Sequence, residues 1–180
     1  MLSRLILKHF SWYNVTMPSI MEKPSETASN FTGDYSKQVV SRKRVADYGE
    51  VYTSEREVNA MLDLVKPETE RIESRFLEPA CGNGNFLIEV LRRKLAKITE
   101  RYAQNRLEYE RYAVSALCSL YGIDILDDNV IQCRNRLYAY FTNKYMDLFG
   151  LYQDENYPST IKFILERNII LGDALTLRNH

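Results

Sequence analysis

The sequence predicts an α/β protein in which parallel strands alternate with helical crossovers. Three short apolar runs, at 75–77, 120–124 and 169–171, are candidates for buried strands. Longer stretches with apolar residues at helical spacing precede and separate these runs, and a glycine-rich turn connects the first run to the next helix. Strands separated by helices imply a parallel sheet with helices packed on it. Three strands make only part of such a sheet, and we expect it to expose an apolar face.

The first helix is expected to begin near Ser54. Ser54 and Glu57 have the spacing of a capping box, in which each side chain binds a free backbone N–H of the first turn. Pro67 is expected to end this helix. Its apolar face consists of Val58, Met61, Leu62 and Val65.

Helical patterns follow each of the first two strand candidates. The helix after Gly84 carries the apolar stripe Leu87, Val90, Leu91, Leu95 and Ile98. A charged helical stretch covers about 103–118. A further helix starts near 127, where Asp127 or Asp128 can cap it. Its buried face consists of Val130, Cys133, Leu137 and Phe141. Residues 146–157 are interpreted as a loop or broken helix, and 158–165 as a short helix with proline in its first turn.

The length of 180 residues suits one domain of ordinary size. Residues 1–44 are predicted to be a poorly ordered leader, because 18–34 is rich in Pro, Ser, Thr and Asn. Residues 45–180 are then an incomplete domain. The basic cluster near the boundary is interpreted as a solvated face. It consists of Lys37, Arg42, Lys43 and Arg44.

Composition narrows the class of protein. Apolar residues make up 45% and charged residues 27%, as in globular proteins. Twenty-four basic residues balance twenty-four acidic ones, whereas nucleic-acid binders often carry a basic excess. Three widely spaced cysteines and two histidines have no zinc-site spacing, so no metal site is expected. A reduced, cytoplasmic setting fits this cysteine usage, and the absence of a long apolar run predicts no membrane-spanning helix.

The turn between the first strand and its helix is the most informative stretch. Gly82 and Gly84 can take positive φ and allow a ligand to approach the backbone. The helix N-terminus beyond Gly84 offers free N–H groups to a carboxylate or phosphate. Glu78 at the strand end disfavours a pyrophosphate and suits a cationic group such as an ammonium. A dinucleotide site is disfavoured, because the third glycine of that motif is missing.

Two aspartates follow the other strand candidates. Asp124 stands where an acidic residue accepts hydrogen bonds from ribose hydroxyls in doubly wound nucleoside sites. Taken alone, such an aspartate more often caps a helix, but its pairing with the glycine-rich turn favours the ribose role. Asp173 can accept a hydrogen bond from an exocyclic amine, or it is an ordinary loop carboxylate.

These residues carry a resemblance to a known family. Glu-Pro-Ala-Cys-Gly-Asn-Gly-Asn-Phe at 78–86 resembles the first motif of the S-adenosylmethionine-dependent adenine-N6 DNA methyltransferases. The segments 121–125 and 172–175 resemble the second and third motifs, and Tyr52-Thr53 resembles the segment that precedes them in the gamma order. The resemblance covers about 45–177 and implies part of the Rossmann-like methyltransferase fold, with S-adenosylmethionine as the cofactor.

The resemblance implies a role for each matching residue. Tyr52, Thr53 and Glu78 would surround the methionine end of the cofactor, with Thr53 near its carboxylate and Glu78 near its amino group. The loop under the methionine, the residue packed behind it, and the ribose and adenine contacts would come from Ala80, Gly82, Gly84, Phe86, Asp124, Ile125, Asp173 and Ala174. Cys81 would be a small packed residue in the loop.

The resemblance stops short of catalysis. The family's catalytic motif, Asn or Asp followed by Pro-Pro and an aromatic residue, does not occur, and no two prolines are adjacent. The chain is therefore expected to carry the cofactor side of a restriction–modification methyltransferase but no catalytic residue. DNA would be the partner of the complete enzyme, and a second chain could supply the missing motif. The alternatives are a methyltransferase for RNA or protein, or a non-catalytic module that binds the cofactor or a partner.

Overall fold

The structure is a computed structural model that describes residues 41–48, 50–176 and 178–179. The first 40 residues of the predicted leader, including Lys37, lie outside the described residues. The first described element is the helix α1 (Arg42–Tyr48), which the sequence did not predict and which begins inside the stretch assigned to the leader.

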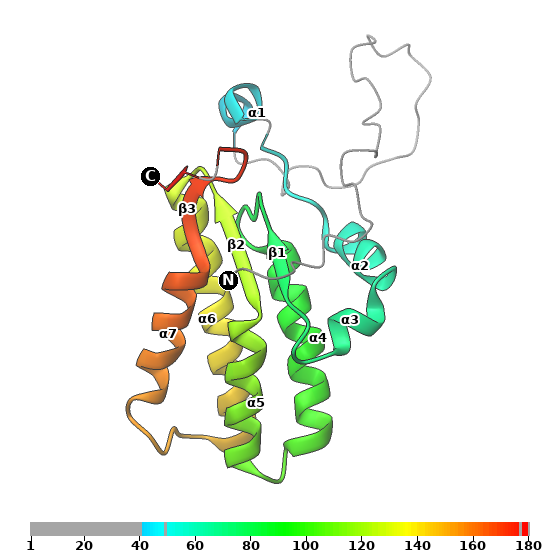
Figure 1. The fold of residues 1–180 in the computed structure, drawn as a ribbon, viewed down its shortest axis with the longest axis vertical. Helices are drawn as coiled ribbons and strands as arrows, with labels where there is room; N and C mark the ends of the chain where they lie inside the picture. The colour runs from blue at the N-terminus through cyan, green and yellow to red at the C-terminus, as the bar shows by residue number, and fades with distance from the viewer. Residues whose placement is uncertain (1–40, 49, 177, 180) are drawn as a thin grey trace. The chain divides into compact units, whose positions relative to one another are not determined.

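A four-stranded sheet organises the fold, with strand order β1-β2-β3-β4 (Figure 1). β1, β2 and β3 pair in parallel, which confirms the predicted α/β class. The last strand pairs antiparallel with β3 and was not predicted. The bounds are β1 Phe76–Glu78, β2 Leu120–Asp124, β3 Ile169–Asp173 and β4 Arg178–Asn179.

Each parallel crossover contains two helices, in agreement with the helical patterns predicted between the strands. α4 (Asn85–Tyr102) and α5 (Arg106–Cys118) connect β1 to β2. α6 (Asp127–Phe149) and α7 (Tyr157–Asn168) connect β2 to β3. Two shorter helices precede the sheet, α2 (Glu55–Asp63) and α3 (Lys66–Glu70). The described part of the fold is thus compatible with part of a Rossmann-like sheet.

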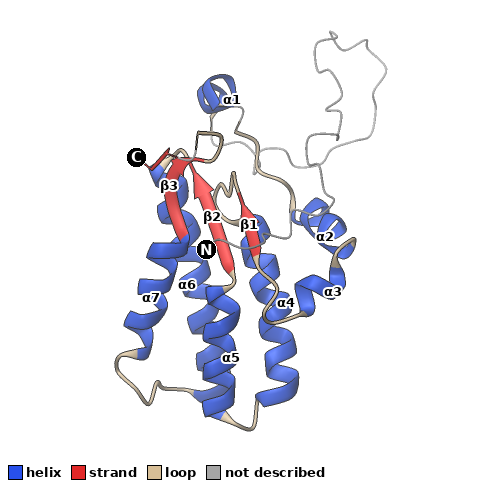
Figure 2. Ribbon diagram, viewed as in Figure 1, coloured by secondary structure: helices blue, strands red, loops and turns tan. Residues whose placement is uncertain are grey.

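Helices cover one face of the parallel strands, and among the described residues no helix covers the other, which we call the open face (Figure 2). Right-handed crossovers that advance in one direction across a sheet place their helices on the same face. In Figure 2 the strands lie in front of α4 and α6, and none of the described helices crosses their near face. Leu120 and Ile169 point to the covered face and are fully buried. The open face carries Leu77, Tyr121, Ile123 and Ile170, which neighbour one another through the strand register.

The apolar side chains on this open face are partly exposed, as expected for an incomplete sheet. Leu77 on the edge strand β1 is 46% exposed, and Tyr121, Ile123 and Ile170 are half-buried. Parallel sheets usually have both faces covered. Among the described residues, this face therefore offers partly exposed apolar side chains, and the edge of β1 beside it offers unpaired backbone groups.

The core lies between the sheet and the helices and continues below the strands. The helices are much longer than the strands, so their far halves pack on each other instead of on the sheet. Tyrosine rings fill this layer: Tyr109 and Tyr145 are fully buried, and Tyr145 stacks on Tyr152 with ring centroids 4.5 Å apart. These tyrosines are packing residues of the core.

A buried lysine joins the sheet to α4. The Lys94 ammonium is fully buried and donates hydrogen bonds to the Ile72 carbonyl at 2.9 Å, to the Ser119 hydroxyl at 2.7 Å and to the Ser74 carbonyl at 2.5 Å. These contacts fix the loop before β1 to the residue before β2. Burial lowers the pKa of Lys94 to about 8.

Some predicted boundaries were wrong. The capping box of Ser54 and Glu57 is present, but α2 ends at Asp63, and Pro67 lies in the first turn of α3 instead of ending α2. Proline needs no N–H in a first turn, which explains its place there. Asp127 and Asp128 do not cap α6: its N-cap is Leu126, without a side-chain cap. The same helix continues to Phe149, into the stretch interpreted as a loop. Among the described residues, no helix combines the length and apolar character needed to cross a membrane.

Candidate functional site

The glycine-rich turn lies between β1 and α4 and takes the backbone conformation predicted for it. Gly82 has φ 51° and Gly84 has φ 91°, both in the left-handed region. Gly84 is the N-cap of α4 and gives no side-chain cap. A Cβ at Gly84 would lie 2.7 Å from the Cys133 sulfur, so the turn sits directly on α6. The position thus requires glycine for both its φ and its space.

Asp124 ends β2 beside this turn and binds it. Its Oδ2 accepts a hydrogen bond from the Gly82 N–H at 2.8 Å. Its Oδ1 accepts from the Leu126 N–H at 3.0 Å and from Asn129 Nδ2 at 3.2 Å. The carboxylate therefore holds the glycine turn and the start of α6 together through hydrogen bonds to both. Oδ2 keeps one lone pair for a further donor.

Tyr52 covers the turn from the other side. A Cβ at Gly82 would lie 3.3 Å from the Tyr52 ring, and the Tyr52 hydroxyl donates to Asn129 Oδ1 at 2.9 Å. Burial raises the pKa of Tyr52 to about 12. The next residue, Thr53, is tied to the start of α4, because its carbonyl accepts from Asn85 Nδ2 at 2.9 Å. The segment before α2 therefore lies against the turn.

Glu78 is the last residue of β1 and lies at the same strand ends. Burial raises the pKa of its carboxyl to about 7, although a hydrogen bond from the Ala80 backbone acts in the opposite direction. A nearby cation would stabilise the ionised form of this carboxyl and lower its pKa again.

The remaining predicted residues lie around the strand ends. Asp173 Oδ1 accepts from the Leu175 N–H at 2.8 Å, and its Oδ2 accepts from the Thr176 hydroxyl at 3.0 Å, so Asp173 shapes the turn after β3. Ile125 is 48% exposed, whereas Phe86 packs against the core. Ala80 is exposed and Ala174 is half-buried. Direct contacts join Tyr52, Gly82 and Asp124; the parallel register brings the end of β3 beside the end of β2.

One face of α6 supports the turn. The sequence predicted that Cys133 lies on the buried face of this helix, but not that Asn129 and Arg136 help to support the turn. Asn129, Cys133 and Arg136 follow one another at helical spacing along this face. Asn129 contacts Tyr52 and Asp124, and Cys133 lies beneath Gly84. Arg136 Nη1 donates to the Asn83 carbonyl at 2.7 Å and to Asn85 Oδ1 at 2.9 Å. The signal available in the sequence was polar residues at the spacing of the buried helix face.

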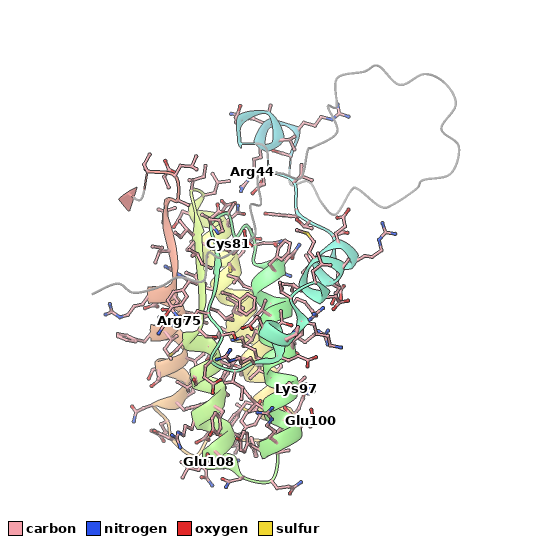
Figure 3. The ribbon with its side chains drawn as sticks, turned by 45° about the vertical axis from the view of Figure 1, so that its right-hand side comes forward. Arg44, Arg75, Cys81, Lys97, Glu100 and Glu108 are labelled. Carbon is pink, nitrogen blue, oxygen red and sulfur yellow. The ribbon has the colours of Figure 1, made fainter. Side chains whose placement is uncertain are left out.

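Arg44 is not part of a solvated face, which corrects that interpretation for one member of the basic cluster. Its guanidinium pairs with Glu50 and Asp128 and donates to Asn129 Oδ1 at 3.3 Å. Burial alone would raise the pKa of Glu50, but hydrogen bonds from Arg44 and Asn129 outweigh it, and the pKa is lowered. Figure 3 shows Arg44 and Cys81 at one end of the described fold and Glu108 at the other. The neighbouring Arg42 and Lys43 are exposed.

The loop cysteine is a packing residue. Cys81 and Cys133 are both buried, and a hydrogen bond with Cys133 together with burial raises the pKa of the Cys81 thiol. A thiol held neutral in this way is a poor nucleophile. Within the described ranges, no three His, Cys, Asp or Glu side chains gather as metal ligands.

No family model, curated protein or solved structure matches this chain. Its function is therefore argued from the site itself.

Proposed function

We propose that this chain is the S-adenosylmethionine-binding portion of a site-specific adenine-N6 DNA methyltransferase of a restriction–modification system. The observation that carries the proposal is the contact between Asp124 and the Gly82 N–H beneath the Tyr52 ring. It unites three of the segments on which the family resemblance rests, at the carboxyl ends of parallel strands. Ligands of open α/β sheets bind at such strand ends.

The residues present fit the groups of this cofactor. Glu78 is a half-buried carboxyl with a raised pKa, and the cofactor's ammonium is the cation that would ionise it. The N-terminus of α4 carries no side-chain cap and suits the carboxylate at the same end of the ligand. Asp124 Oδ2 has capacity for a ribose hydroxyl, the exposed Ile125 can lie on the adenine ring, and Asp173 can accept from the adenine amine.

In the proposed reaction this chain binds and orients the donor. S-adenosylmethionine supplies an electrophilic methyl group when bound. Tyr52, Glu78 and Asp124 would fix its two ends, so that the methyl group faces an amine presented from elsewhere. The Asn/Asp-Pro-Pro-aromatic motif, which holds the target adenine in the family, is absent from the sequence. We therefore assign no catalytic residue to this chain.

The acceptor side and the DNA contacts would come from polypeptide outside these 180 residues, in a second chain or segment. The open sheet face and the edge of β1 support this part of the proposal, because they offer apolar surface and unpaired backbone where further strands would pair. An enzyme that methylates chromosomal sites would act in the cytoplasm of its host.

A non-catalytic module is the second candidate, and one observation favours it. The net charge of zero gives the chain no general attraction to DNA phosphates. A methyltransferase for RNA or protein would share the donor pocket. The two experiments below test whether the chain binds the cofactor and whether it acts on DNA, RNA or protein.

Binding of S-adenosylhomocysteine should depend on pH through Glu78. The carboxyl has a pKa of about 7 in the free protein, and the ligand's ammonium binds only its ionised form well. We expect affinity to fall about tenfold per unit as pH drops from 7 to 5 and to level off above 7. Calorimetry across this range measures it. The variant Glu78→Gln should bind more weakly at pH 8 and lose the pH dependence. A pH-independent affinity in the wild-type chain would contradict the role of Glu78 at the ammonium.

Methyl transfer should be undetectable with the chain alone. Losing the hydrogen-bonding unit that holds the reacting amine typically costs about 10²–10⁴-fold in rate. The purified chain, labelled S-adenosylmethionine and mixed-sequence duplex DNA are incubated, and label in DNA is counted. RNA and protein substrates serve as parallel arms. Turnover on DNA would show that an acceptor site exists within these residues, and turnover only on RNA or protein would replace the DNA assignment.

A further inference from the structure

Asn129 is a neutral side chain surrounded by charged and polar groups at the start of α6. It is 2% exposed. Its Oδ1 accepts from the Tyr52 hydroxyl at 2.9 Å and from Arg44 Nη2 at 3.3 Å. Its Nδ2 donates to Glu50 Oε1 at 2.7 Å and to Asp124 Oδ1 at 3.2 Å. These four bonds use the full hydrogen-bonding capacity of an amide.

The two N–H bonds of this amide go to two carboxylates. Glu50 and Asp124 come from segments far apart in the sequence, and both accept from the same nitrogen. Two carboxylates in a partly buried space repel each other unless a positive charge balances them, and here Arg44 pairs with Glu50. Asn129 donates to both carboxylates without adding charge and so links the segment before α2 to the end of β2.

Asn129 also connects the two residues that hold the glycine turn. The Tyr52 ring packs against Gly82, and Asp124 accepts from the Gly82 N–H. The Tyr52 hydroxyl and the Asp124 carboxylate both bind the Asn129 amide, on its oxygen and its nitrogen respectively. The alternative partner of the hydroxyl, Glu50, is at a longer 3.5 Å. The Asn129 side chain is therefore the shortest hydrogen-bonded path between the two groups in the described structure.

We infer that Asn129 is a positioning residue that couples Tyr52 to Asp124. It fixes the tyrosine above the glycine turn relative to the carboxylate beside it, so that each group holds a ligand well only when the other is in place. The coupling exists in the protein itself. Its effect on a nucleoside-containing ligand rests on the proposed function.

The test is a set of double-mutant cycles in the full chain. Tyr52→Phe removes only the hydroxyl, and Asp124→Ala removes the carboxylate. Both changes are made singly and together, with native Asn129 and again in the backgrounds Asn129→Ala and Asn129→Leu. Leucine keeps the branched shape of the side chain, adds no charge and removes the hydrogen bonds to Tyr52 and Asp124. If the alanine background does not fold, the leucine background still tests the link.

Two quantities are measured for every variant: the affinity for S-adenosylhomocysteine and the unfolding equilibrium constant in urea. With native Asn129, the effects of the two substitutions should deviate from multiplicativity by about fivefold in both quantities. In the Asn129 variants the deviation should fall below about twofold. If Asn129 only fills space, its replacement would destabilise every variant alike and leave the deviation unchanged. This result would overturn the inference.

The two proposals fail in different ways. If the wild-type chain does not bind S-adenosylhomocysteine, the proposed function fails, and the unfolding cycles alone decide the role of Asn129. If the ligand binds but the deviation is independent of Asn129, the proposed function stands and the coupling is wrong.

Discussion

Gly84→Ala should destabilise the chain by about 3 kcal/mol and abolish binding of S-adenosylhomocysteine. Two costs add at this position. A side chain at φ 91° is strained by about 1–2 kcal/mol. The new Cβ would also lie 2.7 Å from the Cys133 sulfur, and forced overpacking of this kind costs about 1–3 kcal/mol. Relief of the overlap would displace the turn from α6 and with it the N–H groups at the start of α4.

Gly150 provides the matched control, because it shares the strain without the overlap. It has φ 76°, and a Cβ there would meet nothing within 4 Å. Gly150→Ala should therefore cost only about 1–2 kcal/mol and leave ligand affinity intact. Cys133→Ala combined with Gly84→Ala should recover part of the loss. Urea denaturation and calorimetry measure both quantities. Equal destabilisation at the two glycines would show that the contact with Cys133 is unimportant.

Lys94 should add about 2 kcal/mol to the free energy of unfolding between pH 8 and pH 10. Its pKa is lowered from 10.5 to about 8 in the folded protein. The unfolded chain therefore binds more protons at this group in this interval, and the contribution of Lys94 to stability increases as pH rises. Below pH 8 the cost of the buried charge is fully present. The Cys81 thiol and Tyr109 act in the opposite direction, because their pKa values are raised in the folded protein, that of Tyr109 to about 12, and their ionisation favours the unfolded chain.

The contribution of Lys94 can be isolated on its own helix. Between pH 8 and pH 10 the free energy of unfolding of Lys97→Met should change by about 2 kcal/mol more in the stabilising direction than that of Lys94→Met, because Lys97 lies on the surface of α4 beside Glu100. Urea denaturation at intervals of half a pH unit measures the curves. Equal changes in the two variants over this interval would contradict the assignment to this lysine.

The sequence predicted the α/β class because hydrophobic periodicity alternates clearly between strand and helix. The stripe from Leu87 to Ile98 and the run at 120–124 correspond closely to α4 and β2. Local signals were weaker at boundaries. Pro67 is compatible with both the end of one helix and the first turn of another, and only packing decides between them. The two-residue β4 has no pattern of its own, and it exists because β3 offers a free edge.

The candidate site was predictable only where a motif carried it. Gly82 and Gly84 lie in the turn after β1 and Asp124 ends β2, so their place at the strand ends comes from local sequence. Arg44, Glu50 and Asn129 come together through tertiary contacts between segments that no spacing relates. A basic cluster gives no indication of which arginine finds two carboxylates. The burial of Lys94 could likewise not be predicted from the sequence, because lysine is rarely buried in proteins.

The open sheet face has a colloidal consequence. Leu77, Tyr121, Ile123 and Ile170 present apolar surface next to the edge of β1, and the chain carries equal numbers of acidic and basic residues. A molecule without net charge has no long-range repulsion to keep such surfaces of neighbouring copies apart. Near neutral pH no such repulsion opposes the short-range attraction. Whether the chain stays in solution then depends on how soon that face is covered after synthesis.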